Sequence, residues 1–181
     1  SIFLNTFDMK YDMIKVYGQD LNSKFRLQLK ACATFSLARM LPKRKRLLDN
    51  VSLDIHVRHH DCEGEARFKD GDNVYRPRNF QIIIDKHRLV KDDYQRECSE
   101  TEHAHKIFET LCHECVHVKQ YLTNELTFRT GNLFWKGHHY DVESMLDYHE
   151  TPYEIEAYGR QRGLLLGFLS VISKLEDEIE Y

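Results

Sequence analysis

The chain has 181 residues, of which 41% are hydrophobic and 30% charged, and its formal net charge at pH 7 is −3. This balance is typical of a globular domain that buries a core without disulfide or metal staples. A weakly negative chain has no general attraction to nucleic acid or to an anionic membrane. We therefore expect a single domain over residues 1–181, with neither nucleic acid nor membrane as a partner.

The cysteines and the lack of long apolar runs indicate a cellular compartment. Five cysteines are an odd number, and they lack the regular spacing of an extracellular disulfide framework. No apolar run has the length of a membrane span, and the first residues lack a signal-peptide pattern. We expect a cytoplasmic protein whose thiols are small buried side chains, the neighbouring Cys112 and Cys115 included.

The first half of the chain predicts a helix followed by a small sheet. Residues 1–20 are expected to form a short helix or an irregular lead-in. Apolar residues then recur at helical spacing over residues 21–40, and Pro42 ends the pattern. Alternating or β-branched segments predict three short strands, over residues 53–57, 65–68 and 80–84.

The second half predicts two helices separated by a hairpin. Ser99 and Glu102 have the spacing of a capping box, which predicts a helix from there to about Leu122. Residues 127–136 are typical of a hairpin with Gly131-Asn132 at its turn. A last helix is expected from Thr151-Pro152 through residue 174, with glycines that would interrupt it. The order predicts an α+β fold in which the two late helices face one another across a metal ion.

The sequence His113-Glu114-Cys115-Val116-His117 lies in the body of the first of these two helices. Residues four apart share a helix face, so both imidazoles can point at one ion. Glu114, about a third of a turn round the helix, can hold a metal-bound water and take its proton as a general base. The pattern indicates hydrolysis by zinc-activated water, most often of a peptide bond.

A catalytic zinc ion with three protein ligands keeps one position open for water, so a third ligand must come from elsewhere. The histidine of the metzincin continuation is absent after His117. Glu154 and Glu156 are carboxylate candidates on the last helix, and residues two apart cannot both reach one ion. We favour Glu156, because the small Ala157 beside it would let the helices pack closely, whereas Glu154 has a separate role near the helix N-terminus.

An amide hydrolase also stabilises the oxyanion of its transition state. Tyr153 precedes Glu156 by three residues and shares its helical face, which makes Tyr153 the candidate catalytic residue. The alternative for each tyrosine is to pack the core with its hydroxyl at the edge. Four further side chains that lie between the metal motifs could also stabilise the oxyanion, namely His138, His139, Tyr140 and Tyr148.

Three stretches within residues 105–165 resemble a known family. They are H-E-C-V-H-V-K-Q-Y-L-T-N-E-L, F-W-K-G-x-x-Y and T-P-Y-E-I-E-A-Y-G-R, in this order. Together they resemble zinc metallopeptidases of tailed bacteriophages, which are grouped loosely with the SprT-like and gluzincin proteases. The resemblance implies a zincin-like core, a phage origin, and Zn²⁺ held by His113, His117 and Glu156. The chain departs from the family pattern at Gln161, where a glutamate is expected.

The sequence thus predicts an α+β, zincin-like zinc metallopeptidase that acts on a protein or peptide in the cytoplasm, the host cytoplasm if a phage encodes it. In such enzymes an edge strand beside the metal helix binds substrate by β-addition, and residues 80–84 are either that strand or an interior one. The alternative function is a catalytically silent phage protein that acts as a structural or binding module. The intact Glu114 favours the enzyme, because a structural metal site needs no base.

Overall fold

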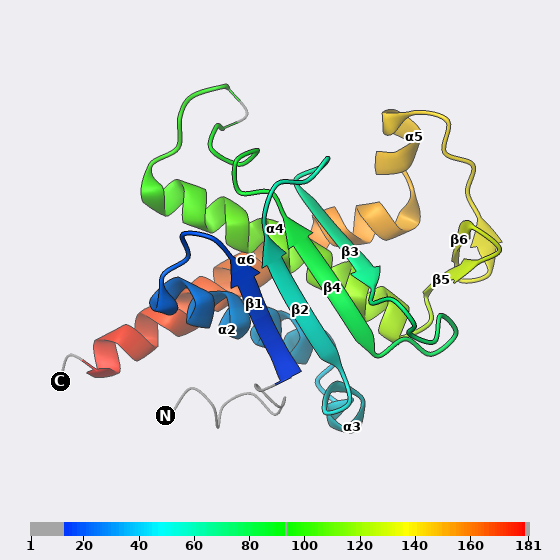
Figure 1. Cartoon of the computed structure of the whole chain (residues 1–181), viewed down its shortest axis with the longest axis horizontal. Helices are drawn as coiled ribbons and strands as arrows, with labels where there is room; N and C mark the ends of the chain where they lie inside the picture. Colours follow the sequence, from blue (N-terminus) through cyan, green and yellow to red (C-terminus); the bar gives the residue numbers. More distant parts are fainter. Residues whose placement is uncertain (1–12, 93, 180–181) are drawn as a thin grey trace.

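The computed structural model describes residues 13–92 and 94–179, with the side chains of residues 175–179 excepted. Its elements combine one mixed sheet, a second small sheet and five helices (Figure 1). In chain order they are β1 (Ile14–Gly18), α2 (Ser23–Met40), α3 (Lys45–Leu48), β2 (Ser52–Val57), β3 (Gly64–Phe68), β4 (Asn79–Ile84), α4 (Glu100–Leu122), β5 (Leu126–Arg129), β6 (Asn132–Trp135), β7 (His138–His139), α5 (Met145–His149) and α6 (Pro152–Ile179). The expected α+β class is confirmed.

The larger sheet has the strand order β1-β2-β4-β3, in which β1, β2 and β4 are parallel and β3 is antiparallel to β4. Along β2 every second residue is buried, as the alternating sequence predicts. Strand β1 was not expected, because residues 14–18 lie in a segment that was interpreted as a lead-in. Its pairing with β2 aligns Ile14 with Leu53, and both side chains are fully buried.

The structure decides which strand forms the edge of the sheet on the side of β4. Strand β4 pairs with β2 on one side and β3 on the other, and its consecutive isoleucines are fully buried. Residues 80–84 are therefore an interior strand, and they are not available for β-addition. Strand β3 pairs only with β4 among the described strands, so β3 is the edge strand on this side of the sheet.

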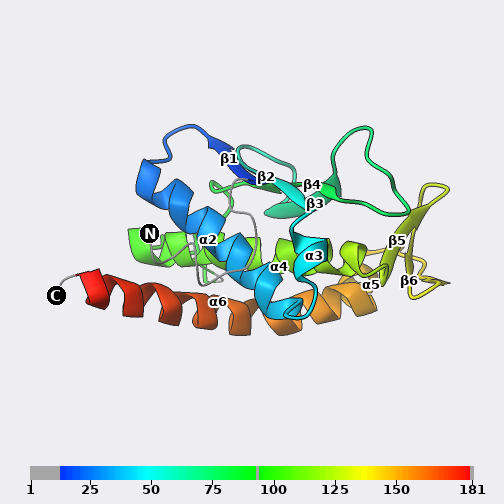
Figure 2. The same cartoon turned by 90° about the horizontal axis from the view of Figure 1, so that it is seen from below.

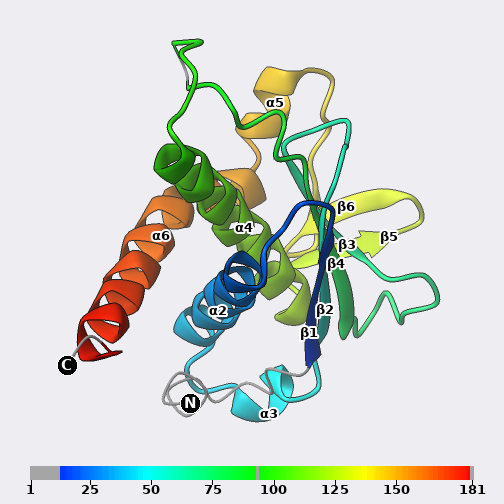
Figure 3. The same cartoon turned by 60° about the vertical axis from the view of Figure 1, so that its left-hand side comes forward.

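The helices form two layers on one face of this sheet. Helices α2 and α4 lie against the strands, and α6 packs on the side of α4 that faces away from the sheet (Figures 2 and 3). Helix α4 is thus central, and residues 111–120 are buried on every side. It begins at the predicted capping box, in which Ser99 and Glu102 bond each other's backbone N–H. The predicted pairing of two late helices is confirmed.

The last helix and the hairpin differ from expectation only in detail. Helix α6 continues unbroken through Gly159 and Gly163, neither of which has a neighbour that an added Cβ would meet. The hairpin of β5 and β6 turns at Thr130 and Gly131, one residue earlier than expected. Both residues have positive φ, at 50° and 84°, as a type I′ turn requires.

Two further expectations concern the cysteines and membranes. Cys112 and Cys115 are fully buried, as expected, and the Sγ of Cys112 lies 3.7 Å from that of Cys32 on α2. All three thiols are free and pack the contact between the two helices and the core. Cys98 is only half-buried and Cys62 is exposed, so the expectation of buried thiols is wrong for these two. None of the helices in the described ranges is both long and apolar enough to cross a membrane.

Candidate metal centre

Two helices bring three potential metal ligands together in the interior. His113 and His117 project from α4 toward the first turn of α6, where Glu154 faces them. The Nε2 atoms of the histidines lie 3.2 Å apart, and each is 3.2 Å from one oxygen of Glu154. All three residues are buried, and their ligand atoms lie within 4.8 Å of one another. This spacing suits three atoms that share one ion.

The chemistry of the three donors fits a metal ion. Glu154 Oε2 is fully buried and, although His113 Nε2 lies 3.2 Å away, it accepts no well-aligned hydrogen bond, the one such side-chain atom among the described residues. A buried carboxylate oxygen without such a bond is costly, and a cation would satisfy it. Two imidazoles and one carboxylate are a common three-ligand set for catalytic zinc. The cluster can therefore hold a metal ion.

The structure places Glu154, and not the favoured Glu156, beside the two histidines. Glu156 lies away from the cluster, where its Oε1 accepts hydrogen bonds from Lys119 Nζ at 2.9 Å and Arg160 Nε at 2.8 Å. Its Oε2 accepts from Gln120 Nε2 at 3.0 Å. Burial alone would raise the pKa of Glu156, but the hydrogen bonds from Lys119 and Gln120 and the charges of Lys119 and Arg160 hold it below its usual value. Glu156 is thus an ion-pairing residue.

Helix geometry explains the correction. Ala157 is fully buried against α4, so a small residue does permit close packing of the two helices. On a helix, however, Ala157 shares its face with the residue three positions earlier, which is Glu154. Glu156 precedes Ala157 directly and is turned about a quarter of a circle away. The close packing at Ala157 therefore brings Glu154, which shares its face, toward α4, and not Glu156.

Glu114 lies beside the cluster and against the edge strand. Its side chain is buried, and a Cβ added to Gly64, the first residue of β3, would lie 2.6 Å from Glu114 Oε1. Burial raises the pKa of Glu114, and the neighbouring His117 and His113 partly offset that rise. A carboxylate with a raised pKa is a better proton acceptor near neutral pH. The position and the pKa direction both suit the predicted general base.

Two glutamines that the sequence analysis did not assign contact the outer nitrogens of the histidines. Gln161 Oε1 lies 2.8 Å from His113 Nδ1, and Gln120 Oε1 lies 2.9 Å from His117 Nδ1. Metal-ligating histidines commonly donate their second N–H to such acceptors. One signal was present in the sequence, because Gln120 follows His117 by three residues and shares its helix face.

The structure separates the candidates for an oxyanion-stabilising role. Tyr153 is buried with its ring centroid 6.5 Å from that of His117. Tyr148 lies beside Glu154, and burial together with this carboxylate raises the pKa of Tyr148, so its hydroxyl stays protonated. A third tyrosine near the ligands is Tyr158, whose ring packs edge-on to that of His113 with 4.6 Å between the ring centroids. The exposed candidates that do not join the cluster are His138, His139 and Tyr140.

The charges of the cluster depend on one another. Burial disfavours a charge on His117, but Glu154 and Glu114 outweigh it and raise the pKa of His117 to about 9. Burial alone would raise the pKa of Glu154, but His113 and His117 hold it well below its usual value. Without a metal ion, the cluster is therefore a buried ion pair at neutral pH, and a bound cation would take the place of the proton on His117.

This ion pair predicts how the stability of the metal-free protein depends on pH. The pKa of His117 rises from 6.5 to about 9 on folding, so its stabilisation is complete below pH 6.5 and lost as the pH rises through 9. We expect the free energy of unfolding, from urea denaturation in a chelator, to fall by on the order of 3 kcal/mol across this range. His117→Gln should remove the fall, and His105→Gln, on the same helix, should keep it. Equal stability at both ends of the range would contradict the ion pair.

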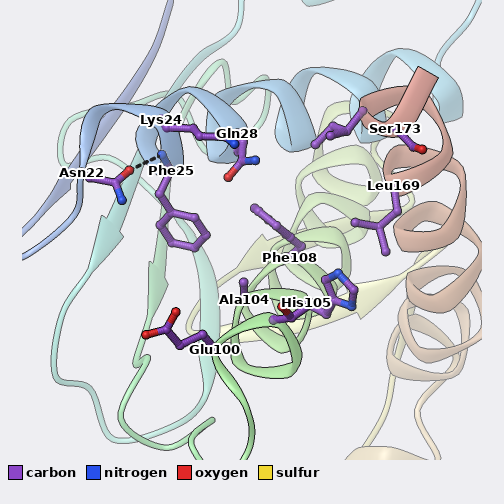
Figure 4. A pocket seen from close by; sticks show the side chains of 12 residues that line it. Asn22, Lys24, Phe25, Gln28, Glu100, Ala104, His105, Phe108, Leu169 and Ser173 are labelled. Carbon is purple, nitrogen blue, oxygen red and sulfur yellow. Dashed lines mark hydrogen bonds between the residues drawn. The ribbon is translucent and has the colours of Figure 1, made fainter. Parts of the chain in front are cut away.

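A separate cavity lies at the other end of α4 and contains none of the three ligands. It has a volume of about 750 Å³, is open on one side, and is lined by residues of α2, α4 and α6 (Figure 4). Phe25, Phe108 and Leu169 form its apolar lining, and His105 lies at its rim. His105 precedes His113 by eight residues, which is about 12 Å along a helix. This cavity is therefore distinct from the candidate metal cluster.

Comparison with known proteins adds no family to this geometry. No family model, no curated protein and no solved structure matches the chain. The case for a function therefore depends on the cluster itself: two histidines and Glu154, with the buried Glu114 beside them.

Proposed function

We propose that the protein is a zinc-dependent hydrolase that cleaves peptide bonds. The observation that carries the proposal is the buried cluster of His113, His117 and Glu154, in which one carboxylate oxygen accepts no well-aligned hydrogen bond. Three protein ligands leave a fourth zinc position for water, which is the arrangement of catalytic rather than structural sites. Zinc bound there would supply Lewis acidity that polarises a carbonyl and lowers the pKa of water.

The residues around the cluster would carry the proton transfers. Glu114 accepts a proton from the attacking water as the oxygen of this water forms a bond to the carbonyl carbon of the substrate. Glu114 then gives this proton to the amine nitrogen as the carbon–nitrogen bond breaks, so the carboxylate is regenerated. The buried surroundings of Glu114 support this role, because burial raises its pKa toward the working pH. Tyr148 or Tyr153 would donate a hydrogen bond to the oxyanion.

The edge strand β3 supports a peptide as substrate. Its free edge offers backbone groups to an extended peptide, and its first residue, Gly64, touches Glu114. A peptide paired with β3 would therefore pass beside the proposed base. This assigns to β3 the role that the sequence analysis considered for residues 80–84.

Metal content and turnover test the proposal together. The purified protein, loaded with zinc and then dialysed, should contain one zinc per chain and should cleave denatured casein or a mixed peptide library. A chelator should abolish cleavage, and added zinc should restore it. Bound zinc without any cleavage would instead support the alternative, a catalytically silent binding module. A protein that binds no zinc would contradict the hydrolase and would also favour the binding module.

Gly64 provides a local test of the position of Glu114. In Gly64→Ala the new Cβ would meet Glu114 Oε1 at 2.6 Å and Thr110 Cγ2 at 2.7 Å. The end of the Glu114 side chain can move away, so we expect the fold and the zinc content to persist. Displacement of the base should lower kcat by about a hundredfold, as measured by peptide hydrolysis.

Gly163→Ala is the matched control for this substitution. No atom lies within 4 Å of a Cβ added at Gly163, which is in the interior of α6. We expect unchanged turnover and a gain in unfolding free energy of about 0.5–1 kcal/mol. If Gly64→Ala were as active as Gly163→Ala, Glu114 would not act from its position beside β3.

A further inference from the structure

The side chain of Gln120 is fully buried and connects the metal cluster to a charged network behind it. Its Nε2 donates to the backbone carbonyl of Tyr153 at 2.9 Å and to Glu156 Oε2 at 3.0 Å. Its Oε1 lies 2.9 Å from Nδ1 of His117. Both polar atoms of this amide therefore make hydrogen bonds, Nε2 with two partners and Oε1 with one.

These partners fix the orientation of the amide. A backbone carbonyl and a carboxylate can only accept hydrogen bonds, so the atom that faces both of them must be the NH₂ group. The remaining atom of the amide, Oε1, can only accept, and it therefore requires a proton on Nδ1 of His117. With Nδ1 protonated, the lone pair of a neutral His117 lies on Nε2, the atom that faces His113 and Glu154.

The network behind Gln120 is itself held in place. Glu156 Oε1 accepts from the buried Lys119 at 2.9 Å, and Lys119 also binds Glu125 at 2.6 Å. Lys119 is 8% exposed, so its charge is largely shielded from water and its two carboxylate partners are required. Glu156 is therefore fixed by charge on one oxygen and is free to orient Gln120 with the other.

His113 lacks a buried hydrogen-bond acceptor like the one that Gln120 provides for His117. Gln161 accepts from His113 at 2.8 Å, but Gln161 is only half-buried on α6. The cluster is thus asymmetric: His117 has a buried acceptor whose orientation is set by two further bonds, and His113 has a single, more exposed one.

We propose that Gln120 is a positioning residue, held by Glu156, that keeps His117 in the tautomer whose Nε2 can bind the metal ion. This inference rests on the proposed zinc site, and it gives a role to Glu156, which is not one of the proposed metal ligands. Fixing the ring before the metal arrives, and keeping the proton on Nδ1 when Nε2 gives up its own proton to the metal, removes a reorganisation cost from binding.

The test compares zinc affinities of variants by competition with a chromophoric chelator. Gln120→Met keeps the length of the side chain but removes the acceptor, so we expect zinc to bind about 10–100-fold more weakly. Glu156→Ala should weaken binding in the same direction but less, because the carbonyl of Tyr153 still orients the amide. In the Gln120→Met background, Glu156→Ala should have no further effect, because two residues that act through one contact are not additive.

An NMR signal separates positioning from a general loss of stability. In the zinc-loaded protein, the Nδ1 proton of His117 should be downfield and protected from exchange, and in Gln120→Met it should move upfield. Arg160→Ala is the matched control, since Arg160 binds Glu156 Oε1 and not the oxygen that orients Gln120. We expect its zinc affinity to stay within about twofold of the parent, because this pair is half-exposed.

The outcomes distinguish this inference from the proposed function. If the parent protein binds no zinc, the metal site itself is wrong. If the parent binds zinc and loses it in His113→Ala, but Gln120→Met binds equally well with an unchanged Nδ1 proton, only the positioning role is overturned. If Gln120→Met does not fold, Glu156→Ala decides: unchanged affinity and an unchanged Nδ1 proton would overturn the proposal.

Discussion

Glu154→Ala should remove zinc binding, whereas Glu156→Ala should keep it. Glu154 supplies the carboxylate between the two histidines, with its oxygens 3.2 Å from their Nε2 atoms. Loss of a direct ligand costs more than the 10–100-fold loss of affinity expected for an outer partner, so we expect at least about a hundredfold weaker binding. Equilibrium dialysis followed by elemental analysis would measure the zinc bound by each variant.

Glu156→Ala is the natural control, because it removes a carboxylate from the same helix two residues away. Its expected effect is smaller, since Glu156 contacts Lys119, Arg160 and Gln120 and not the metal ligands. One zinc per chain in Glu156→Ala and none in Glu154→Ala at equal free zinc would support the assignment. The reverse result would return Glu156 to the role that the sequence predicted.

Glu114→Gln should retain zinc and lose hydrolysis. The substitution preserves size and removes the group that accepts the proton, and general bases commonly contribute about 10²–10⁴-fold to the rate. We expect kcat for a peptide substrate to fall by this factor while zinc stoichiometry stays at one. Stopped peptide-cleavage assays on the zinc-loaded variant, with parallel metal analysis, would measure both.

Glu109→Gln provides a control on the same helix. Glu109 is half-buried one turn before His113 and lies 3.9 Å from Arg162, outside the metal cluster. Its turnover should equal that of the parent. Glu114→Gln with undiminished activity would mean that the base is another group or that the cleavage comes from a contaminating protease.

The elements were largely readable from the sequence because their signals are local. The capping box at Ser99 and the i,i+4 spacing of His113 and His117 act within a few residues, and both occur in the structure as predicted. Strand β1 was missed because its alternation of buried and exposed residues spans only Ile14–Gly18. Its position is set by pairing with β2, which follows more than thirty residues later in the chain.

Non-local packing decided which glutamate lies beside the two histidines. Two glutamates two residues apart were both plausible from the sequence, and the rotation of α6 against α4 selected Glu154. In this arrangement the buried Lys119 on α4 pairs with Glu156, while Glu154 faces the histidines. No local pattern encodes such a pairing between residues that are 37 positions apart.

The sequence by itself determined the two histidines, the adjacent Glu114 and the helix that carries them, since helix periodicity alone places these side chains. Only the tertiary structure decided that Glu154 completes the cluster and that Gln120 lies behind His117. It likewise decided that β3, with Gly64 against Glu114, forms the edge of the sheet on the side of β4. These contacts join segments that are far apart in the chain, so they depend on how the helices and strands pack, and local sequence preferences do not specify that packing.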